Sequence, residues 1–306
     1  AHQHGFNASN IVFAGVGKAD WEINRALELD IQCFNVESLP ELEIINELAT
    51  TQKKVAKLAF RINPNVDART HAKITTGLNE NKFGLAIDDT IPAIRRAQVL
   101  SNIEFVGLHF HIGSQITDLT PFSELCTCIN ELQVQLEEAG ITVPTLNVGG
   151  GLGVNYEQPD ADAIPNFAAY FTIFKQELQL REGQSVHFEL GRSIVAQCGS
   201  LISRVLYVKE GQAKRFVIVD AGMTDLVRPA MYGSLHQIDN LSHPEAPQAL
   251  FDVVGPICES SDVFASDYKL PTPKRGDLLA FRSAGAYGEI MASQYNCRRL
   301  PGHIAE

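Results

Sequence analysis

The chain has 306 residues, 45% of them apolar, which is enough to bury a large core in two domains. Its formal net charge of −11 disfavours nucleic acid and anionic membranes as partners, although a local basic pocket can still bind an anion. No apolar run reaches the about 18 residues that a membrane-spanning helix needs.

Through the first two thirds of the chain, strand patterns alternate with helical patterns. The strand patterns are short, rich in apolar or β-branched residues, and bounded by Gly, Pro or Asn. Ser38 and Glu41 form a capping box before a helical run to about residue 48, and Pro121 suits the first turn of a later helix. The predicted strands are residues 11–14, 32–36, 54–62, 105–112, 145–148 and 185–189, and further helices are predicted at 88–100, 120–140 and 164–180. This alternation predicts six βα units in a row, with parallel strands.

After about Ser193 the long helical patterns stop. Strands are predicted at residues 195–209, 215–220, 249–254 and 277–282, joined by turns such as 209–211. We therefore expect an α/β domain at residues 1–193 and a mostly β domain at 194–306. Six parallel strands fit an open doubly wound sheet, whereas a closed parallel barrel needs eight. The motifs below favour a partial (β/α)8 TIM barrel, strands three to eight, with two units missing from its front.

A glycine run, Gly149-Gly150-Gly151-Leu152-Gly153, follows one predicted strand. Backbone N–H groups in such a loop can approach a phosphate closely because no Cβ intervenes. A tight loop that binds nothing is the alternative. The run lies at the carboxyl end of a strand, where parallel barrels bind their ligands.

Two histidines, His109 and His111, lie two residues apart on a predicted strand and therefore on one face. They could bind a metal, stack on a ligand ring, or be hydrogen-bonded core residues. A zinc site needs further ligands that the pattern does not supply, so we expect no metal. The six cysteines match neither a zinc site nor a redox pair, and we interpret them as reduced thiols of a cytoplasmic protein.

Glu189 and Arg192 follow the last strand of the first domain, where they could bind a ligand or form a structural salt bridge. Four later loops place functional side chains beside glycines, a common setting for binding groups. These loops are residues 220–223, 228–233, 255–262 and 284–288.

In this order, the segments resemble the diaminopimelate decarboxylase family of fold-type III enzymes, which use pyridoxal 5'-phosphate (PLP) and are grouped with alanine racemase and ornithine decarboxylase. The group shares the motifs at residues 111–114, 149–151 and 189–192, whereas residues 228–232 and 258–259 resemble the diaminopimelate branch. The resemblance implies a lyase that converts meso-2,6-diaminoheptanedioate to L-lysine and CO2, the last step of lysine biosynthesis. It also implies a homodimer with a shared active site.

The resemblance also implies residue roles. His111 would stack on the PLP ring, and Glu189 would pair with the pyridine nitrogen, which keeps the ring able to accept electrons. The cofactor and its phosphate would be held by Ser114, Gly150, Gly151, Glu189, Gly191, Arg192 and Tyr287.

For the substrate, the resemblance implies a receptor for its far, zwitterionic end. Guanidinium groups bind a carboxylate in a bidentate way. The substrate-binding residues would be Arg192, Arg228, Tyr232, Glu259 and Tyr287, with Glu259 on the far ammonium. Cys258 would donate the proton that replaces CO2. Cys258 and Glu259 would enter the site of the partner subunit, and Lys82 would pair with Asp262 of the other chain.

Two departures from the family pattern matter. Leu190 replaces a usual Pro, with little expected harm because both charged groups remain. The family's Schiff-base lysine segment, Tyr-x-x-Lys-Ala-Asn, is absent, and Lys18 matches a different lysine of the family. We therefore expect an N-terminally truncated chain that is inactive and poorly soluble by itself. The rival interpretations are a PLP decarboxylase of ornithine, arginine or carboxynorspermidine, and a catalytically dead homologue that binds a partner protein.

Overall fold

The computed structural model describes residues 1–68, 82–161 and 164–304, and the chain divides into two compact units. The first unit comprises residues 1–151 and 167–190, and the second comprises 152–166 and 191–306. The segment 152–166 thus packs with the second unit, although its neighbours in sequence belong to the first. None of the helices in the described ranges is long and apolar enough to cross a bilayer.

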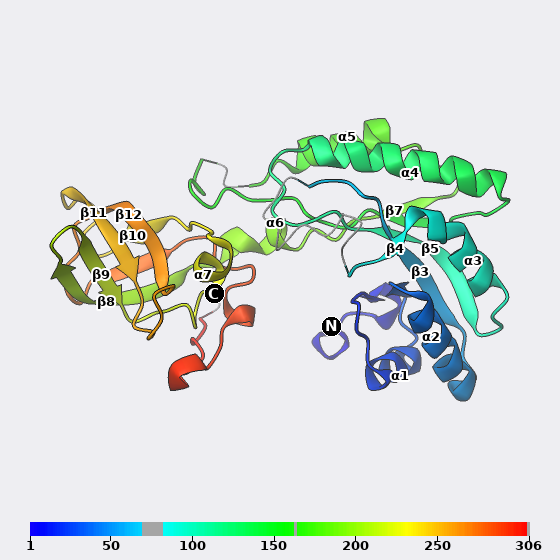
Figure 1. The fold of residues 1–306 in the computed structure, drawn as a ribbon, viewed down its shortest axis with the longest axis horizontal. Coiled ribbons are helices and arrows are strands. Elements are labelled where there is room, and N and C mark those ends of the chain that lie inside the picture. Colours follow the sequence, from blue (N-terminus) through cyan, green and yellow to red (C-terminus); the bar gives the residue numbers. More distant parts are fainter. Residues whose placement is uncertain (69–81, 162–163, 305–306) are drawn as a thin grey trace. The chain divides into compact units, whose positions relative to one another are not determined.

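The first unit is a parallel sheet with helices along its outer side (Figure 1). Its strands are paired in the order β1-β2-β3-β5-β6-β7, and β4 pairs with β3. The strands are β1 (Val12–Phe13), β2 (Cys33–Val36), β3 (Ala56–Asn63), β4 (Leu85–Ala86), β5 (Ile103–Phe110), β6 (Thr145–Asn147) and β7 (Ser185–His187). The helices are α1 (Asp20–Leu29), α2 (Leu39–Gln52), α3 (Thr90–Gln98), α4 (Thr120–Glu138) and α5 (Phe167–Glu177). The predicted βα alternation is therefore confirmed, and within the described residues β1 and β7 are the two open edges of the sheet.

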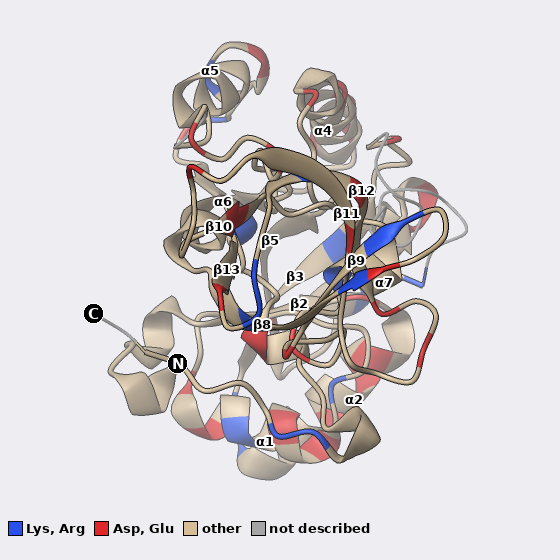
Figure 2. Ribbon diagram, turned by 90° about the vertical axis from the view of Figure 1, so that its left-hand side faces the viewer, with Lys and Arg blue, Asp and Glu red and all other residues tan. Residues whose placement is uncertain are grey.

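Local signals explain where the helices begin. Ser38 Oγ accepts a hydrogen bond from Glu41 N at 3.3 Å, as the capping box predicts. The second bond of the box is displaced, because the Glu41 carboxylate accepts from the N–H of Glu37 and not from that of Ser38. Acidic residues and one basic residue lie along α1 (Figure 2), and Arg25 pairs with Glu28 at 2.8 Å.

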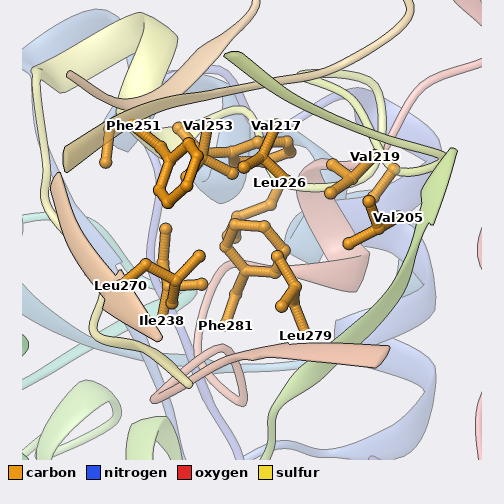
Figure 3. Close-up of a cluster of buried hydrophobic side chains, with 13 residues drawn as sticks. Val205, Val217, Val219, Leu226, Ile238, Phe251, Val253, Leu270, Leu279 and Phe281 are labelled. Atoms are coloured by element: carbon orange, nitrogen blue, oxygen red, sulfur yellow. The ribbon is translucent and has the colours of Figure 1, made fainter. Parts of the chain in front are cut away.

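The second unit is built around a six-stranded sheet in the order β10-β13-β8-β9-β11-β12. Its elements are α6 (Arg192–Val195), β8 (Leu201–Glu210), β9 (Arg215–Val219), α7 (Arg228–Tyr232), β10 (Ile238–Asn240), β11 (Gln248–Val254), β12 (Val263–Pro271) and β13 (Leu278–Phe281). The pairing is antiparallel except between β9 and β11. Buried side chains from these strands and from Leu226 form its core (Figure 3).

The strand predicted at residues 195–209 was wrong in its first part. α6 and a 3-10 helix (Ala196–Cys198) precede β8, which begins only at Leu201. Gly199 separates this 3-10 helix from β8 and lies against Gly285, since a Cβ on Gly199 would lie 2.8 Å from Gly285 Cα. Strands β10 and β12 and helix α7 were not predicted, because β10 and α7 are short and the burial of side chains along β12 does not alternate strictly.

Candidate active site

The carboxyl ends of the first unit's strands carry a group of polar side chains. Glu37 follows β2, His109 and His111 lie at the end of β5, Asn147 ends β6, and Glu189 follows β7. Because these strands are parallel, their carboxyl ends meet at one edge of the sheet, which is where parallel α/β folds bind ligands.

The glycine run lies between the ends of β5 and β7. A Cβ on Gly149 would lie 2.3 Å from Phe110 O, and one on Gly150 would lie 2.2 Å from Glu189 O. Gly149 and Gly151 also have φ angles of 73° and 105°, which favour glycine. Glycine is therefore needed in this run so that the ends of β5, β6 and β7 can lie close together, whether or not the run also contacts a phosphate.

Glu189 is held as an ionised carboxylate. Its Oε1 accepts a hydrogen bond from Asn147 Nδ2 at 2.8 Å, and its Oε2 lies 3.4 Å from His109 Nε2. Burial alone raises the pKa of Glu189, but the His109 ring and the Asn147 amide outweigh it and lower the pKa to about 2. The Glu189 side chain is 35% exposed, so Oε2 remains accessible to a ligand.

His111 is a neutral imidazole. The Gly150 N–H donates to its Nδ1 at 3.3 Å, so Nδ1 carries no proton. Burial lowers the pKa of His111 to about 4, helped by the nearby charges of Arg61 and His109. An uncharged, half-buried aromatic ring is suited to stacking on a ligand ring.

Two further charged pairs at these strand ends escaped the sequence analysis. Arg61 of β3 pairs with Glu37 at 3.1 Å, and both side chains are buried. Lys18 donates to Gly15 O, Asn35 O and Glu41 Oε1 at 2.8, 2.7 and 2.5 Å. An ammonium has three donors, and these contacts use all of them. Lys18 is accordingly a structural lysine.

The second unit gathers two buried arginines around one aromatic ring. Arg192 Nη1 donates to Tyr156 Oη at 2.6 Å, and the Arg228 guanidinium lies 4.4 Å from the Tyr156 ring centroid. Tyr287 faces Arg192 at 4.7 Å. Among the described residues, Arg228 has no ion-pair partner, and its Nε is buried without a hydrogen-bond partner. Tyr156 was not predicted, because it lies in the 152–166 segment, which carries no motif.

Cys258 and Glu259 lie on the exposed loop after β11. The Tyr295 hydroxyl donates to the Glu259 carboxylate. Asp262 shapes this loop from inside, since its carboxylate accepts from Met223 N at 2.6 Å and from Ile257 N at 2.7 Å. Asp262 is nearly fully buried in the single chain, and its expected pairing with Lys82 of another chain stays a prediction.

The predicted site residues thus fall into three groups. One is the strand-end group of the first unit, where Ser114 lies in the loop that packs on Gly151 through Gly113 and Ile116. The second surrounds Tyr156, with Tyr232 at the end of α7 and Gly191 as the N-cap of α6. A Cβ on Gly191 would have no atom of the described residues within 4 Å, unlike one on Gly150. The third is the exposed loop that carries Cys258 and Glu259.

The first group fits PLP on its own chemistry. It offers an ionised carboxylate for a protonated ring nitrogen, a neutral imidazole for the ring face, and a glycine loop at a strand end. A parallel sheet with this edge, followed by a β unit, suits a PLP-dependent enzyme. The family model described as "Pyridoxal-dependent decarboxylase, pyridoxal binding domain" matches residues 1–196.

Individual relatives narrow the class. The chain is 60% identical to the diaminopimelate decarboxylase of Bacteroides thetaiotaomicron, over 97% of this chain and 77% of that protein. The crystal structure of diaminopimelate decarboxylase from Helicobacter pylori complexed with L-lysine is similar with a TM-score of 0.89, at 42% identity over 96% of this chain and 73% of that chain. The lysine/ornithine decarboxylase of Vibrio vulnificus complexed with putrescine is also similar, with a TM-score of 0.81 at 25% identity, over 97% of this chain and 75% of that chain. This chain belongs to the diaminopimelate decarboxylase family.

Proposed function

We propose that the protein removes CO2 from meso-2,6-diaminoheptanedioate and releases L-lysine. The observation that carries this choice is Arg228, a buried guanidinium without an ion-pair partner among the described residues. A buried cation without a counter-charge is costly, so it favours a ligand that brings a carboxylate. Diaminoheptanedioate keeps a carboxylate at its non-reacting end, whereas ornithine has only an ammonium there.

In this proposal the first unit holds the cofactor. Bound PLP supplies an electron sink for the bonding pair that remains at Cα when CO2 departs. Glu189, which stays ionised, keeps a proton on the ring nitrogen, and His111 packs its neutral ring against the pyridine. Ser114, Gly151 and Gly191 offer hydroxyl or N–H donors to the phosphate, and Gly150, whose N–H donates to His111 Nδ1, lets the loop approach it without a Cβ.

The second unit recognises the substrate. Arg192, Arg228 and Tyr232 bind the far carboxylate, Tyr287 contacts both cofactor and substrate, and Glu259 binds the far ammonium. Cys258 then protonates Cα, so that one C–C bond is replaced by one C–H bond. Because Cys258 and Glu259 are exposed on their loop, we further propose that they serve the site of a partner subunit in a homodimer.

We also propose that six strands of the parallel sheet, in the order β1-β2-β3-β5-β6-β7, belong to an eight-stranded (β/α)8 barrel, since β1 and β7 each pair on one side only in the described residues. All six cysteines, each in the described part of the chain, are free thiols. This suits the reducing cytoplasm, which is the proposed location.

The test is substrate selection by the protein expressed from its complete gene and loaded with PLP. It is offered meso-diaminoheptanedioate, ornithine, arginine and carboxynorspermidine separately, and released CO2 and amine products are measured. We expect CO2 and L-lysine from the first substrate only. Faster release from ornithine, arginine or carboxynorspermidine would overturn the choice, and no release from any of them would favour the dead homologue.

A further inference from the structure

A second buried side chain, His236, lies directly against Arg228. His236 is 1% exposed and lies in the link between α7 and β10. Its Nε2 lies 3.0 Å from Arg228 Nη1, and its Nδ1 lies 2.8 Å from the backbone oxygen of Arg282. No sequence motif drew attention to it, since a lone histidine is usually a satisfied core residue.

The two contacts fix the tautomer of His236. A carbonyl oxygen can only accept, so Nδ1 carries the proton, and a guanidinium can only donate, so Nε2 offers its lone pair. The ring is therefore neutral. Burial, together with the charges of Arg228 and Arg192, lowers its pKa to about 4 against the opposing bond to Arg282 O.

Tyr156 holds the same guanidinium from its face. Its ring lies 4.4 Å from Arg228 Cζ, and the His236 ring meets it edge-on at 4.8 Å. Tyr156 is itself fixed, because its backbone oxygen accepts from Gln237 N at 2.9 Å. Its hydroxyl also accepts from Arg192, so one tyrosine contacts both arginines.

These contacts position Arg228 but leave its charge intact. Its donors reach a neutral imidazole and, at 3.4 Å, the hydroxyl of Ser234, while its Nε donates to nothing in the described structure. A carboxylate in place of His236 would give a stronger charge-assisted bond but would neutralise the cation. A neutral acceptor therefore suits a site in which the arginine must attract an anion from outside the chain.

We propose that His236 and Tyr156 are positioning residues that orient Arg228 without neutralising it, and thereby select amino-acid ligands with a carboxylate at the end remote from the reacting amine. This inference rests on the proposed function, in which Arg228 binds that carboxylate. It adds that specificity depends on an uncharged histidine which itself does not bind the ligand.

The test compares two ligands that differ in that carboxylate. L-lysine carries it and cadaverine does not. Calorimetry measures both affinities for the PLP-loaded protein expressed from its complete gene. The wild type should bind L-lysine more tightly. His236→Leu removes the acceptor. We expect this variant to lower the affinity for L-lysine about tenfold to a hundredfold, the usual loss for a hydrogen bond to a charged group, and to leave the affinity for cadaverine unchanged.

Two further variants separate positioning from bulk packing. His236→Gln keeps an uncharged acceptor, and its affinity for L-lysine should stay within about threefold of the wild-type value. His236→Glu keeps an acceptor but adds a negative charge, and should lower the affinity for L-lysine at least as much as His236→Leu does. Thermal unfolding and PLP absorbance of each variant check the fold, and the Gln and Glu pair carries the test if the Leu variant does not fold.

The outcomes distinguish this inference from the proposed function. Equal wild-type affinity for L-lysine and cadaverine would reject Arg228 as a carboxylate receptor, and with it the proposed function. A wild type that prefers L-lysine, together with a His236→Leu variant that keeps the preference, would overturn only the role of His236. Tight L-lysine binding by His236→Glu would overturn the claim that the positive charge of Arg228 must not be neutralised by its neighbour.

Discussion

His109 Nε2 lies 3.4 Å from Glu189 Oε2, which joins the ends of two strands that are not neighbours in the sheet. The distance is long for an N–H···O hydrogen bond, and both ring nitrogens of His109 are buried without a hydrogen-bond partner. Asn147, on the strand between them, makes the only short bond to this carboxylate that the described residues provide. The ionised state of Glu189 therefore depends on the His109 ring and on the hydrogen bond from Asn147.

The first prediction concerns that asparagine. In Asn147→Asp, the acceptor for Gly149 N is kept, but a second carboxylate replaces the donor to Glu189. Two adjacent carboxylates raise the pKa of one of them, so Glu189 should lose part of its charge. We expect kcat/KM at pH 7 to fall about tenfold, the acid limb of the pH profile to move upward, and PLP to bind more weakly in an absorbance titration.

Asn130→Asp is the matched control. Asn130 also makes one donor and one acceptor bond, to Glu177 O and from Gln179 N, but it lies on α4 away from the strand ends. It should lower the unfolding temperature without moving the pH profile. An Asn147→Asp enzyme with an unchanged acid limb would show that Glu189 does not need its amide partner.

The second prediction concerns the glycine loop. In Gly150→Ala, the new Cβ would lie 2.2 Å from Glu189 O, so the β6 and β7 ends must separate. We expect a loss of on the order of 1–3 kcal/mol in the free energy of unfolding, measured with urea, together with weaker PLP binding. Gly17→Ala, where the described residues place no atom within 4 Å of the added Cβ, should change neither. An alanine at residue 150 that is tolerated as well as one at residue 17 would contradict the packing role.

Much of this arrangement follows from sequence periodicity. Short apolar strands that alternate with helices predicted the βα order, and the glycine run, His111 and Glu189 could be placed at strand ends because a strand's end is a local property. Tyr156 and His236 could not be predicted. Each is a single residue without a motif, and its role arises only when residues 152–166 pack with the second unit. The Arg61–Glu37 pair was missed for the same reason, since it joins two strands across the sheet.

The third prediction is a loss of stability in mild acid. His111 and His236 have folded-state pKa values of about 4, below the ordinary value of 6.5. Between pH 6.5 and 4 the unfolded chain therefore binds more protons, so the free energy of unfolding falls as the pH falls. His236 contributes at most about 3 kcal/mol across the window. The lowered pKa of Glu189 acts in a separate window, below its ordinary 4.5 and down to about 2.

Urea unfolding at pH 7 and pH 5 measures this effect. In His236→Gln no group titrates at that position, so the stability difference between the two pH values should shrink. If the stability difference between pH 7 and pH 5 is the same in wild type and in His236→Gln, His236 is already protonated or accessible in the folded protein.

The fourth prediction assigns the proton donor. Cys258 is an exposed, free thiol, and without it Cα has no general acid in the proposed reaction. We expect Cys258→Ala to lower kcat about a hundredfold in the protein expressed from its complete gene. Its affinity for L-lysine and its PLP absorbance should not change, because the thiol holds neither ligand. Cys198→Ala, which removes another exposed free thiol, is the control and should keep full activity. If Cys258→Ala and Cys198→Ala are equally active, the proton must come from another group, and the loop after β11 would serve only to present Glu259.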